Sequence, residues 1–365
     1  MIIIIVILIV VSIELFYWFS PTFGQNFKKK RTEKIEQSLN FRGGKFQNLV
    51  ETPVQAEGFK FREVFWEFMF KGKERRPEKP IETINFDKNS FVKADSGIAI
   101  TWFGHSTALI RIDGYSILFD PVFSKRTSPV SFAGTKSFDF TKAYDLSDLP
   151  ELNAIIITHD HYDHLDYKTI KKLKEKNVKF YVPLGVAAHL EKWGVRDTNI
   201  VELDWWENAK FDDNLILRAT PSRHFSGRRG MTNKTLWCSW VIKTDSHSVF
   251  FSGDSGYGDH FGEIGEKCGP FNVTMLECGQ YNEGWPYIHM MPEQTVQANI
   301  DLNGDVMIPI HWGRFNLSLH SWTEPAERVA VEAKRKNINI LIPQIGEIYF
   351  YGDTMSSINW WADKK

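Results

Sequence analysis

From residue 97 onward, short apolar runs are separated by turn residues and by segments with helical spacing. The Asp113-Gly114 pair marks a tight hairpin between two of the earliest runs. Runs of alternating or continuous apolar residues predict strands, whereas apolar residues three and four apart predict helices. We expect strands at 97–102, 108–112, 116–119, 154–158, 178–182, 199–203, 215–219, 237–243, 248–252, 306–310, 338–342 and 347–351, and helices at 167–176, 186–193, 293–301 and 325–336. Strands that alternate with helices over this length predict two sheets with helices outside them.

The first 23 residues form an apolar segment, interrupted as far as Phe19 only by Ser12 and Glu14. A helix needs about 20 apolar residues to cross the hydrocarbon core, so we predict a single-pass membrane anchor at 1–23. A cleaved signal peptide and a buried helix are the alternatives, although neither a basic leader nor a small-residue cleavage site is visible. Basic residues follow the run at 28–31, which favours the cytoplasmic face for the rest of the chain.

Residues 24–95 are polar and rich in turn residues, and we expect them to form an N-terminal extension. Within this extension, apolar residues recur at helical spacing at Phe61, Val64, Phe65, Phe68 and Met69. This stripe predicts an amphipathic aromatic helix packed on the main domain. The alternative is a lid over an apolar groove or a contact with a membrane surface. The main domain is expected at 96–351, followed by a C-terminal tail at 352–365.

Composition excludes several classes of function. Hydrophobic residues make up 42% of the 365 residues and charged residues 24%, so the chain can bury a core. A net charge of −1 argues against a nucleic-acid partner. Three cysteines are too few for a disulfide framework or a cysteine-rich zinc module. A monomer and an oligomer are both compatible with this composition.

The strongest chemical signal is the stretch Thr-His-Asp-His-Tyr-Asp-His-Leu-Asp at 158–166, at the end of a predicted strand. In an extended chain His159 and His161 lie on the same side and can share one ion. Asp163 and His164 then turn back toward a second ion. Imidazole and carboxylate ligands without thiolate suit zinc, with manganese or iron as alternatives.

This motif resembles that of the metallo-β-lactamase superfamily. The resemblance implies an α/β fold, an αββα sandwich with a two-metal site between its sheets. The family pattern calls for a later His, an Asp and a final His, which this sequence supplies in Thr220-Pro-Ser-Arg-His224, Phe250-Phe-Ser-Gly-Asp254 and Ile308-Pro-Ile-His311. By this resemblance one ion is held by His159, His161 and His224, and the other by Asp163, His164 and His311. Asp254 bridges the two ions.

Further motifs across residues 40–350 resemble the N-acyl-phosphatidylethanolamine-hydrolysing phospholipase D branch of the superfamily, in its bacterial, membrane-anchored form. They are Phe46-Gln-Asn48, Trp102-Phe-Gly-His-Ser-Thr107, Phe119-Asp-Pro-Val-Phe-Ser124, Leu203-Asp-Trp-Trp-Glu207, Lys234-Thr-Leu-Trp-Cys-Ser-Trp240 and Ile308–Gly313. The resemblance implies a dizinc enzyme that cleaves a membrane phospholipid to N-acylethanolamine and phosphatidic acid. The alternatives are a hydrolase of another ester, lactone or phosphodiester, such as a sugar-phosphate lactonase, and a catalytically idle binding scaffold.

A two-metal centre activates a bridging water and stabilises the attacking and leaving oxygens of a phosphodiester. Asp163 and Asp254 are expected to orient and deprotonate this water. His105 and Asp120 are expected to support the ligands by hydrogen bonds. His289, on the loop before the last ligand, is expected to contact the phosphate or to protonate the leaving group. The candidates to line an acyl groove are Tyr281, Trp285 and Tyr287.

Overall fold

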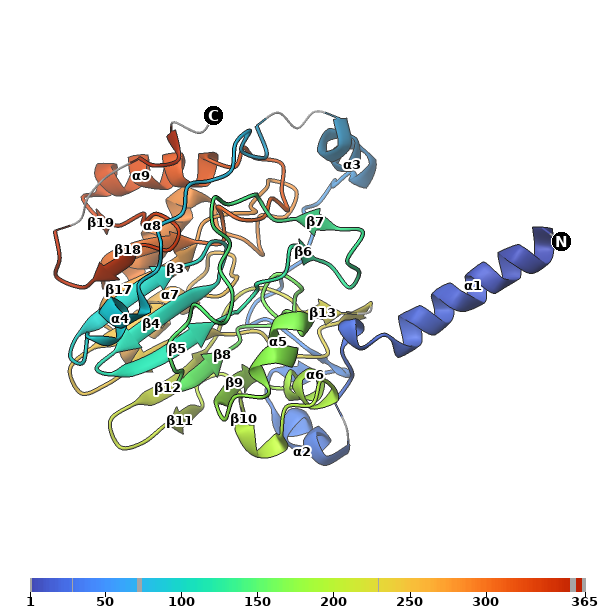
Figure 1. The fold of residues 1–365 in the computed structure, drawn as a ribbon, viewed down its shortest axis with the longest axis horizontal. Helices are drawn as coiled ribbons and strands as arrows, with labels where there is room; N and C mark the ends of the chain where they lie inside the picture. The colour runs from blue at the N-terminus through green and yellow to red at the C-terminus, as the bar shows by residue number, and fades with distance from the viewer. Residues whose placement is uncertain (1, 28, 71–73, 229, 355–358, 363–365) are drawn as a thin grey trace.

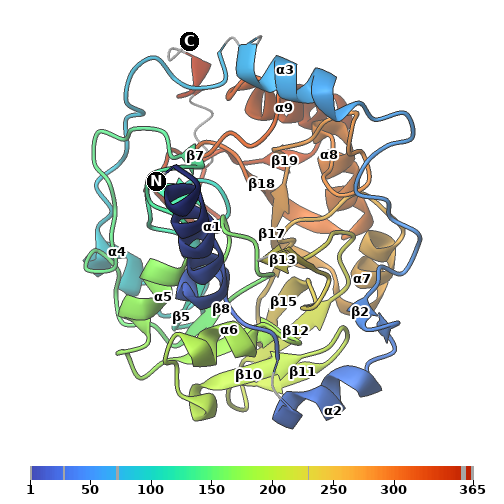
Figure 2. The same cartoon turned by 90° about the vertical axis from the view of Figure 1, so that its right-hand side faces the viewer.

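The computed structural model of the protein describes residues 2–27, 29–70, 74–228, 230–354 and 359–362. Two mixed seven-stranded sheets pack against each other (Figure 1). Helices α5 (Tyr167–Leu173) and α6 (Ala187–Lys192) lie beside one sheet, and α8 (Pro292–Asp301) and α9 (Glu324–Lys336) lie beside the other (Figures 1 and 2). The predicted α/β sandwich is therefore confirmed.

The first sheet has the strand order β10-β9-β8-β5-β4-β3-β20. Its β20, β3, β4 and β5 pair antiparallel, whereas β5, β8, β9 and β10 pair parallel. The bounds are β3 (Ile98–Trp102), β4 (Ala108–Ile112), β5 (Tyr115–Phe119), β8 (Ala154–Ile156), β9 (Lys179–Pro183), β10 (Ile200–Leu203) and β20 (Ile348–Phe350). Almost every residue of β3, β4, β5 and β8 is buried, which is the burial expected of strands covered on both faces.

The second sheet has the order β11-β12-β15-β16-β17-β18-β19, antiparallel as far as β16 and parallel beyond it. The bounds are β11 (Asn208–Lys210), β12 (Ile216–Thr220), β15 (Ser239–Lys243), β16 (Ser248–Phe251), β17 (Phe271–Glu277), β18 (Gly304–Ile310) and β19 (Asn339–Ile340). The remaining helices are α1 (Ile2–Phe19), α2 (Lys29–Gln37), α3 (Phe61–Phe70), α4 (Lys88–Val92) and α7 (His260–Cys268). Short two-residue strands complete the fold at β1 (Phe41–Arg42), β2 (Lys45–Phe46), β6 (Arg126–Thr127), β7 (Thr135–Lys136), β13 (Gly227–Arg228) and β14 (Met231–Thr232).

The two sheets meet through aromatic contacts in a continuous core. Phe119 of β5 stacks on Phe251 of β16 with ring centroids 4.5 Å apart. The Trp240 indole N–H of β15 donates to the Ile157 carbonyl at the end of β8, over 3.1 Å. These contacts lie near the ends of β5, β8 and β16, so they bring together the loops that follow those strands.

Strand β17 and helix α7 were not among the predicted elements. Asn272, Thr274 and Glu277 interrupt the apolar run of β17, which hides its periodicity. In the fold this strand lies in the interior of the second sheet, between β16 and β18. The Thr274 hydroxyl donates to Asn299 Oδ1 over 2.6 Å, so the buried polar group is satisfied by a partner on α8.

Helix α1 covers most of the predicted membrane anchor and projects away from the sandwich (Figure 1). Within the described part of the chain, no helix combines the length and apolar character needed to cross a membrane. The predicted membrane-spanning anchor is therefore not supported.

The segment that follows α1 is docked on the sandwich. Residues 21–25 form four hydrogen bonds with residues beyond 188: Trp193 Nε1 to the Pro21 carbonyl, Arg228 Nη2 to the Thr22 carbonyl, Lys192 Nζ to the Gly24 carbonyl, and the Gln25 amide to His189 Nδ1. Their lengths run from 2.7 to 3.0 Å. The predicted boundary at residue 23 thus falls inside a docked segment.

Two truncations separate the roles of α1 and the docked segment. Deleting residues 1–15 removes the exposed part of α1 and should leave the free energy of unfolding almost unchanged. Deleting residues 1–25 also removes the four hydrogen bonds and should lower that free energy by about 2–5 kcal/mol. Urea denaturation of the two truncated proteins and the full chain makes the comparison. Equal stability of the two truncations would contradict a structural role for residues 21–25.

Candidate metal centre

The predicted ligands meet at one end of the sandwich, where strands of both sheets finish. The first sheet supplies the loop after β8, which carries His159, His161, Asp163 and His164. The second sheet supplies His224 after β12, Asp254 after β16 and His311 after β18. All of them are buried except His161, which is partly buried. Separate apolar strands thus carry side chains from distant parts of the sequence to one place.

One group contains His159, His161, His224 and Asp254, each with a ligand atom within 4.8 Å of the others. His161 Nδ1 lies 2.9 Å from His159 Nε2 and 3.3 Å from His224 Nε2. Asp254 Oδ2 lies 3.7 Å from His159 Nε2 and 3.6 Å from His224 Nε2. Tetrahedral zinc with ligands at about 2.1 Å requires ligand atoms about 3.4 Å apart. These four side chains fit one such ion.

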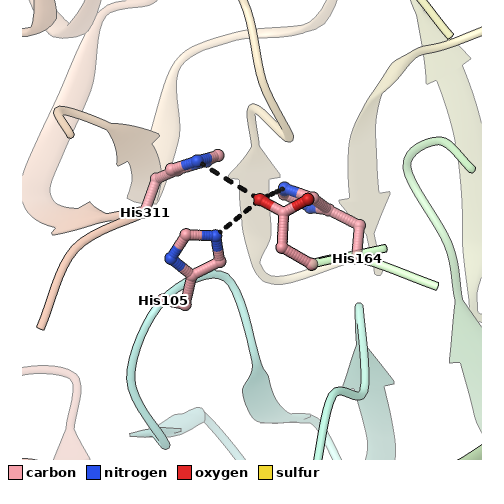
Figure 3. A group of neighbouring side chains, drawn as sticks. His105, His164 and His311 are labelled. Atoms are coloured by element: carbon pink, nitrogen blue, oxygen red, sulfur yellow. Dashed lines mark hydrogen bonds and ion pairs between the residues drawn. The ribbon is translucent and has the colours of Figure 1, made fainter. Parts of the chain in front are cut away.

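A second group contains Asp163, His164, His311 and His105. Figure 3 shows the three histidines around one carboxylate, and Asp163 Oδ2 lies 2.8 Å from His105 Nε2, 3.4 Å from His164 Nε2 and 3.8 Å from His311 Nε2. Asp254 connects the two groups, because its Oδ2 lies 3.2 Å from His164 Nε2 and its Oδ1 contacts His311 Nδ1. This is the location required of the predicted bridging carboxylate.

In the first group the ionisation states fit metal binding. Burial lowers the pKa of His159, and neighbouring histidines lower it further. Burial likewise lowers the pKa values of His161 and His224. Burial alone raises the pKa of Asp254, but nearby imidazoles, His164 first, hold it well below its ordinary value. Neutral imidazoles and an ionised carboxylate are the forms that bind a metal. In the second group burial lowers the pKa of His164, but Asp254, Asp163 and Asp120 together raise it well above its ordinary value.

Buried partners orient several of these side chains. Asp120 accepts hydrogen bonds from His164 Nδ1 over 2.7 Å and from the amide and hydroxyl of Thr158 over 2.8 and 2.6 Å. His164 Nε2, the opposite ring atom, has no hydrogen-bond partner among the described residues and faces the group. The Asn48 side chain holds the His224 backbone in place. It accepts a hydrogen bond from the His224 amide over 3.1 Å and donates one to the His224 carbonyl over 2.7 Å. Metal-binding histidines are commonly held in this way.

Strained backbone gathers at the same site. His105, Asp120, Gln280 and His311 have φ values of 55°, 38°, 63° and 69°, a region that non-glycine residues seldom occupy. Such residues persist only where the surroundings hold them. The His311 amide donates to the His105 carbonyl over 2.8 Å, and the Gln280 side-chain amide donates to the His311 carbonyl over 3.1 Å. These bonds fix the loop of the last predicted ligand.

His289 lies beside both groups. Its ring centroid is 5.1 Å from that of His224 and 5.2 Å from that of His311. Its Nδ1 lies 3.2 Å from Oε2 of Glu277, at the end of β17. Burial, followed by the neighbouring Asp254, raises the pKa of Glu277 well above its ordinary value. Glu277 was not predicted from the sequence, because strand β17 was not predicted. The available signal was an acidic residue at the end of an apolar run, directly before Cys278-Gly279.

A cavity of about 330 Å³ opens onto the ligands. Predicted ligands form one wall, and the apolar side comprises Val54, Phe59, Val64, Phe225, Trp285, Ile288 and Leu317. Of the three aromatic residues expected to line a groove, the structure places Trp285 at this cavity. Tyr281 is instead buried, and its hydroxyl donates a hydrogen bond to Glu324 Oε1 over 2.8 Å. Tyr287 lies under Arg223, whose guanidinium is 4.8 Å from the centroid of the Tyr287 ring.

Residues 115–312 match the family described as the β-lactamase superfamily domain. An uncharacterised protein of Mycobacterium tuberculosis is 40% identical over 89% of this chain and 88% of its own length. The N-acyl-phosphatidylethanolamine-hydrolyzing phospholipase D 1 of Caenorhabditis elegans is 31% identical over 75% of this chain and 81% of its own length. The isothiocyanate hydrolase from Delia radicum gut bacteria shares the fold, with a TM-score of 0.56 at 21% identity over 70% of this chain and all of that one.

The chain belongs to the metallo-β-lactamase superfamily, and it is a metal-dependent hydrolase of that superfamily. Within the superfamily it is a homologue of the N-acyl-phosphatidylethanolamine-hydrolysing phospholipases D. The His and Asp groups described above are able to hold metal.

The geometry predicts about two metal ions per chain, because two ligand groups share one carboxylate. Asp254→Asn should lower the metal content toward one equivalent, since the shared anionic ligand becomes neutral. The exposed Asp245→Asn is the matched control and should keep the metal content of the parent. Elemental analysis and melting temperatures measure both effects. A full metal content in Asp254→Asn would contradict the bridging assignment.

Proposed function

We propose that the protein hydrolyses the phosphodiester of an N-acylated glycerophospholipid to N-acylethanolamine and phosphatidic acid, at a centre of two zinc ions. One observation carries the proposal: a single cavity joins the two ligand groups to an apolar wall. A substrate that has both a phosphodiester and a fatty chain requires a metal-binding surface and an apolar surface in the same cavity. The homology to N-acyl-phosphatidylethanolamine-hydrolysing enzymes supports the same substrate class.

The metal centre has residues assigned to each ion. His159, His161 and His224 would hold one ion, Asp163, His164 and His311 would hold the other, and Asp254 would be shared between them. When bound, two zinc ions supply an activated water and compensate the charge on the phosphate oxygens. His105 and Asp120 orient Asp163 and His164 through the hydrogen bonds already described. Asp163 and Asp254 accept hydrogen bonds from the attacking water and hold it in line with phosphorus.

The apolar wall binds an acyl chain. Phe59 packs against Trp285 with ring centroids 6.4 Å apart, and Val64 brings helix α3 to the cavity. Next to Val64 on α3, the side chains of Phe65, Trp66 and Phe70 are 52%, 58% and 64% exposed. Aromatic side chains at the mouth of a lipid-binding cavity favour contact with a lipid surface. A phospholipid can then enter the cavity without its chains passing through water.

His289 serves the leaving group. Its Nδ1 faces Glu277, so Nε2 is the nitrogen available to a substrate. Burial lowers the pKa of His289, which keeps the imidazole neutral near pH 7. The neutral acid of Glu277 donates to Nδ1 while Nε2–H donates to the departing oxygen. As the P–O bond breaks, the Nε2 proton moves to the alkoxide and the Glu277 proton moves to Nδ1, which leaves a Glu277 carboxylate to be reprotonated.

Product analysis tests the proposed substrate. The purified protein should release N-acylethanolamine and phosphatidic acid from N-acyl-phosphatidylethanolamine in mixed micelles, and a chelator should abolish the release. Mass spectrometry of both products identifies the bond that breaks. A phosphorylated sugar lactone is the comparison substrate and should be hydrolysed much more slowly. Rapid lactone hydrolysis with no lipid cleavage would contradict the proposal.

Replacement of His289 tests leaving-group protonation. His289→Ala should keep the metal content and lower kcat for the lipid by about 10²-fold, the low end for general acid–base catalysis. A phosphodiester with a nitrophenol leaving group needs no proton, so its kcat should fall much less. Glu277→Ala should lose part of the lipid activity, and Glu277→Gln should lose a similar part, because its amide donates a hydrogen bond to Nδ1 but transfers no proton. Equal losses on both substrates would exclude leaving-group protonation.

A further inference from the structure

A second cavity, of about 400 Å³, lies beside the loop that carries the predicted ligands. Tyr162, Leu165 and Asp166 of that loop form part of its wall, yet no predicted ligand lines it. The segment 123–131 and the start of α5 form the other walls. The proposed function gives this cavity no role.

The cavity has an excess of positive charge. Five cationic side chains and two carboxylates line it. Lys125 and Lys168 form no ion pair with any described residue, whereas Lys172 lies near enough to Asp145 to act on its charge. Asp166 already accepts hydrogen bonds from the Ser124 hydroxyl over 2.9 Å and from the Lys168 amide over 3.1 Å. Lys125 and Lys168 therefore have no carboxylate of the described residues bound to them.

Arg228 closes the inner side of the cavity and is 2% exposed. Its Nη1 donates to the carbonyls of Asp160 and Leu165, each over 2.7 Å, and its guanidinium lies 4.0 Å from the ring centroid of Tyr162. The Nε–H has no hydrogen-bond partner among the described residues. Asp160 and Asp166 lie near enough to act on the charge of Arg228, but the hydrogen bonds of the guanidinium go to backbone carbonyls. Burying a guanidinium is costly, and a bound anion offsets part of that cost.

We propose that this cavity binds an anion carrying a phosphate group. Lysines around the opening and an arginine at the inner end are the side chains that bind phosphate, with Ser128 and Ser131 as additional hydroxyl donors. The volume accommodates a phosphate monoester with a small organic group. Two sources share this chemistry, a soluble phosphomonoester and the headgroup of an anionic lipid.

Binding at this cavity stabilises the loop of the metal centre. Arg228 ties together the carbonyls of Asp160 and Leu165, which flank the predicted ligands Asp163 and His164. An anion bound to Arg228 and the lysines stabilises Arg228 in the position that connects these two carbonyls. Occupancy therefore raises the melting temperature of the metal-loaded protein as well as binding the anion.

The test uses metal-loaded protein and two double variants of equal charge change. Lys168→Glu with Lys172→Glu alters the cavity, whereas Lys171→Glu with Lys176→Glu alters exposed lysines that do not line it. Calorimetric titration with inorganic phosphate and with glycerol 3-phosphate should show at least tenfold weaker binding in the cavity variant alone. Phosphate bound at the metal centre contributes equally in all three proteins and cancels in this comparison.

Vesicles distinguish the two sources. If a lipid headgroup is the ligand, phosphatidylcholine vesicles containing phosphatidic acid should retain the parent and the control variant and release the cavity variant. If a soluble phosphomonoester is the ligand, glycerol 3-phosphate should saturate the parent and raise its melting temperature without vesicles. The proposal is overturned if the parent binds none of these probes, or if the two double variants lose binding equally.

Discussion

Two buried carboxylates, Asp163 and Asp254, face several imidazoles at the place where the two sheets end together. Removing a carboxylate from water costs several kcal/mol unless hydrogen bonds or cations compensate it. Here the compensation comes from histidines on loops of both sheets, and the two ligand groups are suited to metal ions that would complete it. The arrangement therefore requires both sheets to hold their loops in fixed relative positions. The geometry of the centre thus depends on how the two sheets pack.

Hydrogen bonds between the loops fix these relative positions. His105, from the loop between β3 and β4, exchanges backbone hydrogen bonds with residues 311 and 312, from the end of β18. Gln280 accepts from the Leu317 amide and donates to the His311 carbonyl, so a third loop joins them. The left-handed backbone of His105, Gln280 and His311 is the conformational cost of this arrangement.

The same geometry separates polar from apolar surface around one cavity. Predicted ligands and His289 form the polar side, and Phe59, Val64 and Trp285 bring apolar groups from distant segments to the other. A substrate with a charged phosphodiester and a fatty chain meets both sides at once. The second cavity is different, because cationic side chains line it and Arg228 connects it to the ligand loop.

The sequence by itself determined the two-sheet architecture and the order of the predicted ligands along the chain. Apolar periodicity is a local property, so strands such as β4 and β18 could be predicted from it. Chemically dense motifs such as residues 158–166 are also local. The end of an apolar strand then indicates where His224, Asp254 and His311 emerge, because strand ends of a sheet meet at one edge.

Only the tertiary structure decided what surrounds those ligands. It placed the unpredicted strand β17 in the interior of a sheet and Glu277 against His289. It brought Trp285 to the cavity and directed Tyr281 to Glu324. It also docked residues 21–25 on the sandwich, where an anchor boundary was predicted. Each of these outcomes depends on hydrogen-bond and packing partners far away in the sequence, and local periodicity carries no information about which distant groups will meet.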